Sequence, residues 1–330
     1  MDTLTSDQKQ VGWALLAIRL LDRDRGIGFG AGADVPGALL ITSSLMLGVY
    51  TIVKPAAENG WGSGRTLGLG AISLLLLVAF VVREATARNP LIPLRIFRSR
   101  NVSGANVIQA LTVAGMFGMF FMGSLYLQRV LGYGALEIGL AFLPATLIMG
   151  VLSFRFAEPL IMRFGARRTL LPGLVLIAVG LGLFTQAPVD GSYVRNILPV
   201  MIVLGFGIGV CFPALMTLAM SGATQQDAGL ASGLVNTTAE VGGALGLAVL
   251  ATVSATRSDD LISSGESTAS ALTGGYHLAF IIGAVLVVAA IIVAVAVLEQ
   301  EEHATEQAAP EGEAERGEGA RGEPVGSEAG

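Results

Sequence analysis

The stretch AFIIGAVLVVAAIIVAVAVL, residues 279–298, shows what kind of protein this chain is. It contains no charged side chain and is apolar on every side of a helix, whereas a water-soluble helix of this length keeps a polar face. The hydrocarbon core of a bilayer is about 30 Å thick, and a helix needs about 20 apolar residues to cross it. The stretch therefore predicts a transmembrane helix.

The rest of the chain repeats this pattern. Hydrophobic residues make up 53% of the 330 residues and charged residues only 14%, which is not a soluble composition. Outer-membrane barrels need strands of about ten residues with alternating hydrophobicity, and these apolar runs are too long and too uniform for that. We therefore expect an all-α integral membrane protein with about eight transmembrane helices. The predicted runs are 36–53, 66–82, 103–127, 138–157, 169–186, 196–220, 228–253 and 276–298.

Basic residues predict the orientation of these helices, because Lys and Arg favour the cytoplasmic side of short loops. With a cytoplasmic N-terminus, 15 of the 20 basic residues fall on the cytoplasmic side. Tyr and Trp prefer the membrane interface, and several of them fall at outer helix ends or in outer loops. These are Tyr50, Trp61, Tyr126, Tyr133, Tyr193 and Tyr276. We expect a multi-pass protein of the cell membrane with both termini in the cytoplasm.

The two ends of the chain differ from its membrane part. Residues 1–34 hold the apolar stretch VGWALLAIRLL, which is too short to span a bilayer. We expect a cytoplasmic segment with the remnant of a helix, and an interfacial helix is the alternative. Residues 299–330 are rich in Glu, Gly, Ala and Pro, which predicts a disordered acidic cytoplasmic tail.

The sequence offers little for an enzyme or a metal site. Cys211 is the single cysteine, which excludes an intramolecular disulfide, and one cysteine cannot by itself build a metal site. His277 and His303 are isolated in the sequence. There is no glycine-rich nucleotide motif after a strand, no P-loop lysine and no HExxH in the apolar runs. We expect no enzymatic activity, no metal and no cofactor.

The segment FAEPLIMRFGARRTLLPG, residues 156–173, joins the fourth and fifth runs on the predicted inner side. Gly165 permits a tight turn. Three guanidinium groups, from Arg163, Arg167 and Arg168, then lie near lipid headgroups or near acids on neighbouring helix ends. A plain cytoplasmic anchor explains the same arginines equally well.

The seventh run contains NTTAEVGGALG, residues 236–246, and the most deeply placed acid of the eight runs, Glu240. An ionised acid at the bilayer centre costs about 2.5–3.5 kcal/mol. We therefore expect Glu240 to face the bundle interior and to be protonated unless a cation or water reaches it. Proton coupling is one reading; a protonated Glu240 held by Asn236, Thr237 or Thr238 as a packing contact is the other. Glycines at four-residue spacing predict close helix packing in lipid: Gly229, Gly233, Gly242, Gly243 and Gly246.

Several stretches together resemble the carboxy-terminal part of a drug:proton antiporter of the major facilitator superfamily, in the branch with fourteen membrane spans. The resemblance extends from about Arg19 to Leu298 and depends on the order and spacing of its motifs. They are DVPGALLITSSLML, ENGWGS, NPLIPLRIFRSRN, LYLQRVLGYGALEIGLAFLP, RFGARR and AGLASGLVNTTAEVGGALGLAVL.

The resemblance implies a domain organisation and a set of site residues. Residues 35–102 would form two linker helices and a basic cytoplasmic loop, and residues 103–298 the six-helix C-terminal half. RFGARR matches the cytoplasmic gating loop of the family at Arg163, Gly165, Arg167 and Arg168, whereas Met162 and Glu158 depart from the family's pattern. The candidates for lining the central cavity are Asn106, Gln109, Thr112 and Asn236, with interhelical hydrogen bonding as the alternative role.

The resemblance also implies proton-coupled efflux of small lipophilic compounds or drugs. Nothing before Arg19 resembles the first six helices of the family. We therefore expect a truncated chain that does not transport alone, since the family closes two halves around a midplane site. The alternative is a non-transporting membrane module, or a half-transporter that associates with another half or with itself. The expected partners are the lipid bilayer, a small-molecule substrate and protons, with no nucleic acid.

Overall fold

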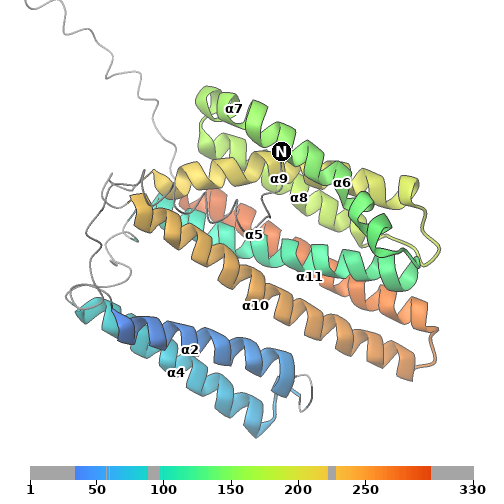
Figure 1. The fold of residues 1–330 in the computed structure, drawn as a ribbon, viewed down its shortest axis with the longest axis horizontal. Coiled ribbons are helices and arrows are strands. Elements are labelled where there is room, and N and C mark those ends of the chain that lie inside the picture. The colour runs from blue at the N-terminus through green and yellow to red at the C-terminus, as the bar shows by residue number, and fades with distance from the viewer. Residues whose placement is uncertain are drawn as a thin grey trace, which may run out of the picture. The chain divides into compact units, whose positions relative to one another are not determined.

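The computed structural model describes residues 34–56, 58, 60–87, 97, 99–221 and 228–298. All regular structure in these residues is helical, which confirms the all-α prediction (Figure 1). Eight helices in these ranges are long and apolar enough to cross a membrane, one for each predicted run. The predicted N-terminal helix remnant, most of the basic loop after the second helix and the acidic tail lie outside the described residues.

The first of two compact units is an antiparallel helix pair. Helix α2 (Val35–Thr51) is continued by a π-helical turn, η1 (Ile52–Ala56), and is followed by α4 (Gly64–Thr86). Ser44 and Ser73 each donate a hydroxyl hydrogen bond to the other's backbone carbonyl oxygen, both at 2.8 Å. These reciprocal bonds fix the register of the two helices and satisfy both hydroxyls inside an apolar pair.

An ion pair joins the far end of this helix pair. The Oδ1 atom of Asp34 accepts a hydrogen bond from the backbone N–H of Gly37 at 3.0 Å and so caps α2. The Arg83 guanidinium binds the same carboxylate, with Nη2 at 2.6 Å and Nε at 2.7 Å from Oδ1. The hydrogen bond from Arg83 holds the pKa of Asp34 below its usual value, against the opposing effect of burial.

This ion pair predicts a pH dependence. Because the folded pKa of Asp34 is depressed, its contribution to stability is present above the unfolded pKa of about 4 and is lost as the pH falls through the folded pKa. We expect the α2–α4 contact to be constant between about pH 5 and 8 and to weaken below about pH 4. The measurement is distance-sensitive fluorescence between labels on the two helices. Asp34→Asn should remove this acid transition, and an identical transition in the variant would contradict the assignment.

The second compact unit contains the six remaining membrane spans. Helix α5 packs against α10 and α11, α8 packs against α9 and α11, and α6 packs against α9. The bounds are α5 Arg100–Leu125, η3 Tyr126–Val130, α6 Ala135–Val151, η4 Leu152–Phe156, α7 Ala157–Phe164, α8 Ala166–Phe184, η5 Tyr193–Ile197, α9 Leu198–Met220, α10 Ala228–Ser263 and α11 Thr268–Val297. Stacked rings of Phe184 and Phe280, 4.6 Å apart, tie α8 to α11 in the core.

Backbone carbonyls of the connection after α8 are held by side chains from two other elements. The Tyr126 hydroxyl donates a hydrogen bond to the carbonyl oxygen of Pro188 at 2.5 Å. A ring nitrogen of His277 lies 2.9 Å from the carbonyl oxygen of Ala187. The structure thus gives His277 a structural contact, which its isolation in the sequence does not reveal.

Helices α10 and α11 extend well beyond the predicted runs. The sequence predicts a run over 228–253, but α10 has 36 residues and a length of about 54 Å at 1.5 Å per residue. The polar residues past Val253 are helical because α10 and α11 pack closely there. A side chain on Gly275 would overlap Ser258, whose hydroxyl instead donates to the carbonyl oxygen of Ser254. Apolar run length marks the bilayer crossing and misses such a hairpin outside it.

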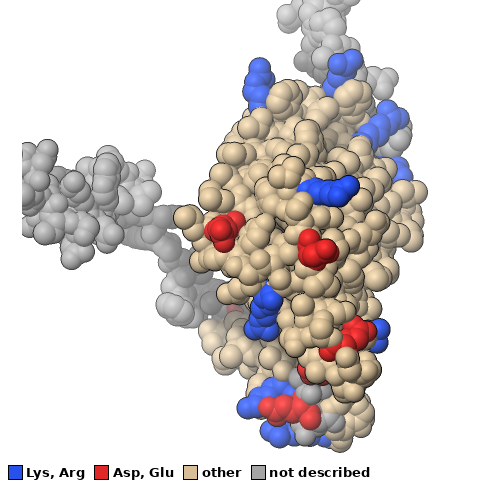
Figure 2. All heavy atoms as spheres, turned by 90° about the vertical axis from the view of Figure 1, so that its right-hand side faces the viewer, with Lys and Arg blue, Asp and Glu red and all other residues tan. Residues whose placement is uncertain are grey.

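Charged side chains are sparse on the surface. Figure 2 views the helix ends at the right of Figure 1, where Lys, Arg, Asp and Glu stand singly or in small groups among uncharged residues. Large apolar side chains such as Leu75, Phe154 and Ile292 are exposed on the described helices. In water such a surface would aggregate, whereas in a bilayer it contacts lipid.

Candidate functional site

One face of α10 packs closely on α5, with glycines at the points of nearest approach. A methyl group on Gly242 would lie 2.8 Å from the Cα of Ala110, and one on Gly246 would overlap Ala114. A methyl group on Gly243 would lie 3.0 Å from the ring of Phe117. Gly242 and Gly246 allow backbone contact between the helices, as small residues do in membrane proteins, and Gly243 makes room for the Phe117 ring.

The opposite face of α10 has no cover from the described residues of the second unit, and it carries small and polar residues. We call this the open face of α10; it comprises Gly229, Gly233, Asn236, Thr237 and Glu240. Spacings of three and four residues place them on one side of the helix. A side chain built on Gly229 or Gly233 would have nothing within 4 Å. The structure therefore gives these two glycines no packing contact with the described residues, unlike Gly242 and Gly246.

The composition of the open face differs from that of a lipid-facing surface. Every other α-helix of the second unit exposes at least two large apolar side chains. On α10, none of the described residues before Ile262 does so. Lipid tails favour contact with Leu, Ile, Val and Phe, whereas Asn and Glu at membrane depth face protein or water. The open face is therefore suited to contact with another polypeptide or with an aqueous cavity.

Glu240 is the residue of this face that lies furthest from the start of α10. It is exposed, and its carboxylate has no hydrogen bond or ion pair with any described residue. It is twelve residues from the start of α10 at Ala228, or about 18 Å along the helix. In a hydrocarbon core of about 30 Å this places the carboxylate near the middle.

Three polar residues on α5, namely Asn106, Gln109 and Thr112, form a row that is buried inside the second unit. The Thr238 hydroxyl donates a hydrogen bond to Oδ1 of Asn106 at 3.0 Å, and Nδ2 of Asn106 donates to the carbonyl oxygen of Val102 at 2.8 Å. Gln109 and Thr112 are buried, and Oε1 of Gln109 and Oγ1 of Thr112 have no partner among the described residues. Asn236 lies apart from this row, on the open face of α10.

The sequence does not predict that Thr238 is the partner of Asn106. Thr238 was one of three neighbours expected to hold Glu240, and the structure brings it to Asn106 instead. The only sequence signal for this bridge is a threonine beside the glycines that bring α10 against α5. Buried Thr and Asn side chains in membrane helices commonly form such interhelical bonds.

The expected gating loop is a single residue. Phe164 is the last residue of α7 and Ala166 the first of α8, so Gly165 alone connects them, with φ 83° and ψ 153°. The backbone N–H of Gly165 donates to the carbonyl oxygen of Ile161 at 2.8 Å, and its own carbonyl oxygen accepts from the backbone N–H of Thr169 at 3.1 Å. Gly165 therefore provides a hydrogen-bond donor for the end of α7 and an acceptor for the start of α8.

The three arginines of this segment lie on either side of Gly165. Arg163 is in the last turn of α7, with its guanidinium 5.3 Å from the centre of the Phe164 ring. Arg168 is exposed in the first turn of α8. Arg167 reaches furthest, because its Nη2 donates a hydrogen bond to the carbonyl oxygen of Val295 at 2.7 Å. This bond satisfies a carbonyl in the last turn of α11, where a cation also suits the helix dipole.

Alanine at position 165 is expected to destabilise the chain by about 1–3 kcal/mol, because the backbone there occupies a region almost restricted to glycine. A methyl group added at Gly165 would have no neighbouring atom within 4 Å, so steric overlap contributes nothing to the expected loss of stability. The measurement is the thermal unfolding midpoint in detergent. Gly150→Ala is the matched control, because Gly150 is helical and equally open. Equal midpoints for the two variants would contradict the assignment.

The sequence matches known membrane transporters. Residues 15–247 match the sequence model of the Major Facilitator Superfamily. The chain is 35% identical over 84% of its length to the puromycin resistance protein of Streptomyces alboniger, covering 56% of that protein. It is 37% identical over 83% of its length to the cephamycin export protein of Amycolatopsis lactamdurans, covering 55% of it.

A third relative is the tetracenomycin C resistance and export protein of Streptomyces glaucescens. The identity is 33% over 69% of the chain and 42% of that protein. The chain therefore spans about half the length of the curated relatives it matches.

Proposed function

The chain belongs to the major facilitator superfamily, and on that premise we propose that it exports small lipophilic compounds in exchange for protons, as one part of a complete transporter. Membership in this superfamily supports a role in membrane transport rather than catalysis. Relatives named for puromycin, cephamycin and tetracenomycin C suggest antibiotics of this kind as the first substrates to test.

The observation that supports this proposal best is the open face of α10. It holds Glu240, a carboxylate with no described partner near the middle of a membrane span, among small and polar residues. A transporter needs such groups at the boundary of a cavity, where substrate and protons can reach them. We propose that a second six-helix body covers this face and that the cavity lies between the two.

Two occupants of the open face are distinguishable. In the first case the cover is a different six-helix segment, such as the part of the relatives that lies outside their match to this chain. In the second case a second copy of this chain covers the face, and the pair forms a symmetric assembly. The mass of the chain in lipid nanodiscs separates the two, since the second case requires a dimer without any other protein.

The transport proposal is tested by fusing this chain to the part of the puromycin resistance protein that lies outside its match to this chain, which we expect to be its first six helices. The fusion is reconstituted into liposomes with an imposed pH gradient, and puromycin movement is followed. We expect gradient-driven transport by the fusion and none by the chain alone. A fusion that is folded and correctly inserted but moves no puromycin and no lipophilic cation would overturn the proposal.

The proposed orientation has its own test. Cysteines at Gly62 and Ser192 should react from outside the cell with an impermeant thiol reagent, whereas a cysteine at Ser221 should not. The first two positions lie at the predicted outer helix ends and the third at the predicted inner end of α9. The native Cys211 is fully buried, so background labelling should be low. The reverse labelling pattern would refute cytoplasmic termini.

A further inference from the structure

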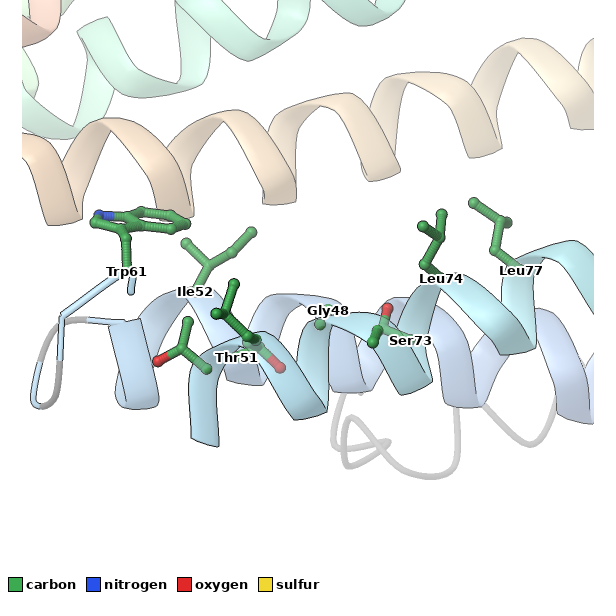
Figure 3. Close-up of a pocket in the computed structure, with 11 residues that line it drawn as sticks. Gly48, Thr51, Ile52, Trp61, Ser73, Leu74 and Leu77 are labelled. Carbon is green, nitrogen blue, oxygen red and sulfur yellow. The ribbon is translucent and has the colours of Figure 1, made fainter. Parts of the chain in front are cut away.

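A groove runs along the surface of the first unit, between α2 and α4. It has a volume of about 450 Å³, within the range of about 300–1,000 Å³ found for small-molecule sites. Figure 3 shows Ile52, Leu74 and Leu77 pointing to the same side of the helix pair, with Gly48 and Ser73 at its floor. The lining residues are Gly48, Thr51, Ile52, Trp61, Thr66, Leu67, Gly70, Ala71, Ser73, Leu74 and Leu77.

The length of the groove matches one leaflet of a bilayer. On α4 its lining extends from Thr66 to Leu77, which is about 16 Å at 1.5 Å per residue. Half of a hydrocarbon core of about 30 Å is nearly the same length. Trp61 lies at the helix-end side of the groove and is half exposed, as expected for an indole at the headgroup level. The groove thus runs from one membrane interface to about the midplane.

The chemistry of the groove favours a hydrocarbon. Its hydroxyl groups are all engaged within the helix pair. Thr51 donates to the carbonyl oxygen of Leu47 at 2.7 Å, and Thr66 donates to that of Gly60 at 3.0 Å. Ser73 donates to the carbonyl oxygen of Ser44 at 2.8 Å. No side-chain polar atom among the lining residues is left buried without a partner. A ligand with donors or acceptors would therefore lose its own hydrogen bonds to water on entering.

We propose that this groove binds one acyl chain of a membrane phospholipid, with the headgroup at the level of Trp61. The small residues Gly48, Gly70 and Ala71 provide the depth, and Ile52, Leu74 and Leu77 provide the apolar contact. An apolar groove one leaflet long matches the length and chemistry of an extended acyl chain. The proposal depends on membrane insertion of the α2–α4 pair and not on the transport activity proposed above.

The test is photolabelling in nanodiscs of phosphatidylcholine that carries a diazirine in the middle of one acyl chain. We expect adducts on Leu74 and Leu77, which line the groove, in excess over Leu75, which does not line it and is exposed on α4. Gly70→Leu fills the groove and should reduce the adducts on Leu74 and Leu77 by at least about fivefold. Gly68→Leu is the matched control, because Gly68 is equally open but does not line the groove.

Three outcomes would overturn the proposal. Equal labelling of Leu74 and Leu75 would mean contact with bulk lipid only. Equal labelling in the Gly70→Leu and Gly68→Leu variants would place the acyl chain elsewhere. Protection of the groove leucines, with cross-links to polypeptide, would show that a protein segment covers the groove. Ala71→Leu fills the same groove from the neighbouring position and replaces Gly70→Leu should that variant fail to fold.

Discussion

Substitution of Gly246 by valine should separate α10 from α5 and lower the stability of the second unit. Even a methyl group at this position would overlap the Cα and Cβ atoms of Ala114. Overpacking of a well-packed core costs about 1–3 kcal/mol, and the loss here should reach at least about 2 kcal/mol because the overlap is with backbone. The two helices would have to move apart, which would also stretch the bond between Thr238 and Asn106.

The same helix provides the control for this prediction. Gly233→Val introduces the same side chain into α10 on the open face, where nothing lies within 4 Å. Unfolding midpoints of the two variants in detergent separate the loss of packing from the change in helix propensity, because both variants make the same glycine-to-valine change. A similar midpoint for both would show that the α5–α10 contact does not need glycine at position 246.

Replacing Glu240 by glutamine should abolish gradient-driven efflux in the fusion with an amino-terminal half. Glutamine keeps the size and hydrogen-bonding capacity of a protonated carboxyl group but cannot release a proton. Substrate binding and insertion should persist, because Glu240 makes no contact with described residues that the fold would lose. The informative measurement is proton release on addition of substrate, which reports coupling rather than expression.

Glu158→Gln is the control for this experiment. Glu158 is exposed in the first turn of α7 and lies outside the open face, so its loss should leave coupling intact. Undiminished substrate-induced proton release from the Glu240→Gln fusion would refute the coupling role. Glu240 would then have a structural role as a polar packing contact, which is the alternative to proton coupling given by the sequence.

Apolar run length was sufficient to predict the membrane crossings. Each of the eight runs corresponds to one described span, because the bilayer imposes its thickness on composition. The ends of α10 and α11 were not predictable in this way. Ser254, Ser258 and Gly275 hold the hairpin together through contacts between residues distant in sequence. The same limit applies at Gly165, where a turn was expected but its reduction to one residue depends on both helices continuing to it.

The glycine pattern shows what spacing can and cannot decide. Gly233 and Gly242 are nine residues apart, or about half a turn in angle at 3.6 residues per turn, so they occupy opposite faces of α10. The spacing predicts that the two glycines lie on opposite faces, but it does not predict which face contacts α5. That depends on the neighbours, because Ala110 and Ala114 on α5 are small enough for backbone contact with Gly242 and Gly246. For the same reason, the hydrogen bond between Thr238 and Asn106 could not be predicted from the sequence.

Helix α10 is long enough to lie partly in the membrane and partly in the water beyond it. The helix continues without proline or a π-helical turn from Ala228 to Ser263. Glu240 lies in its first half, and Asp259 and Asp260 are exposed near the hairpin tip at its other end. We expect a rotation applied at the tip to be carried along this continuous helix to the carboxylate. A water-soluble antibody fragment that binds the tip should therefore slow a conformational change at Glu240 in the middle of the membrane, without entering the lipid.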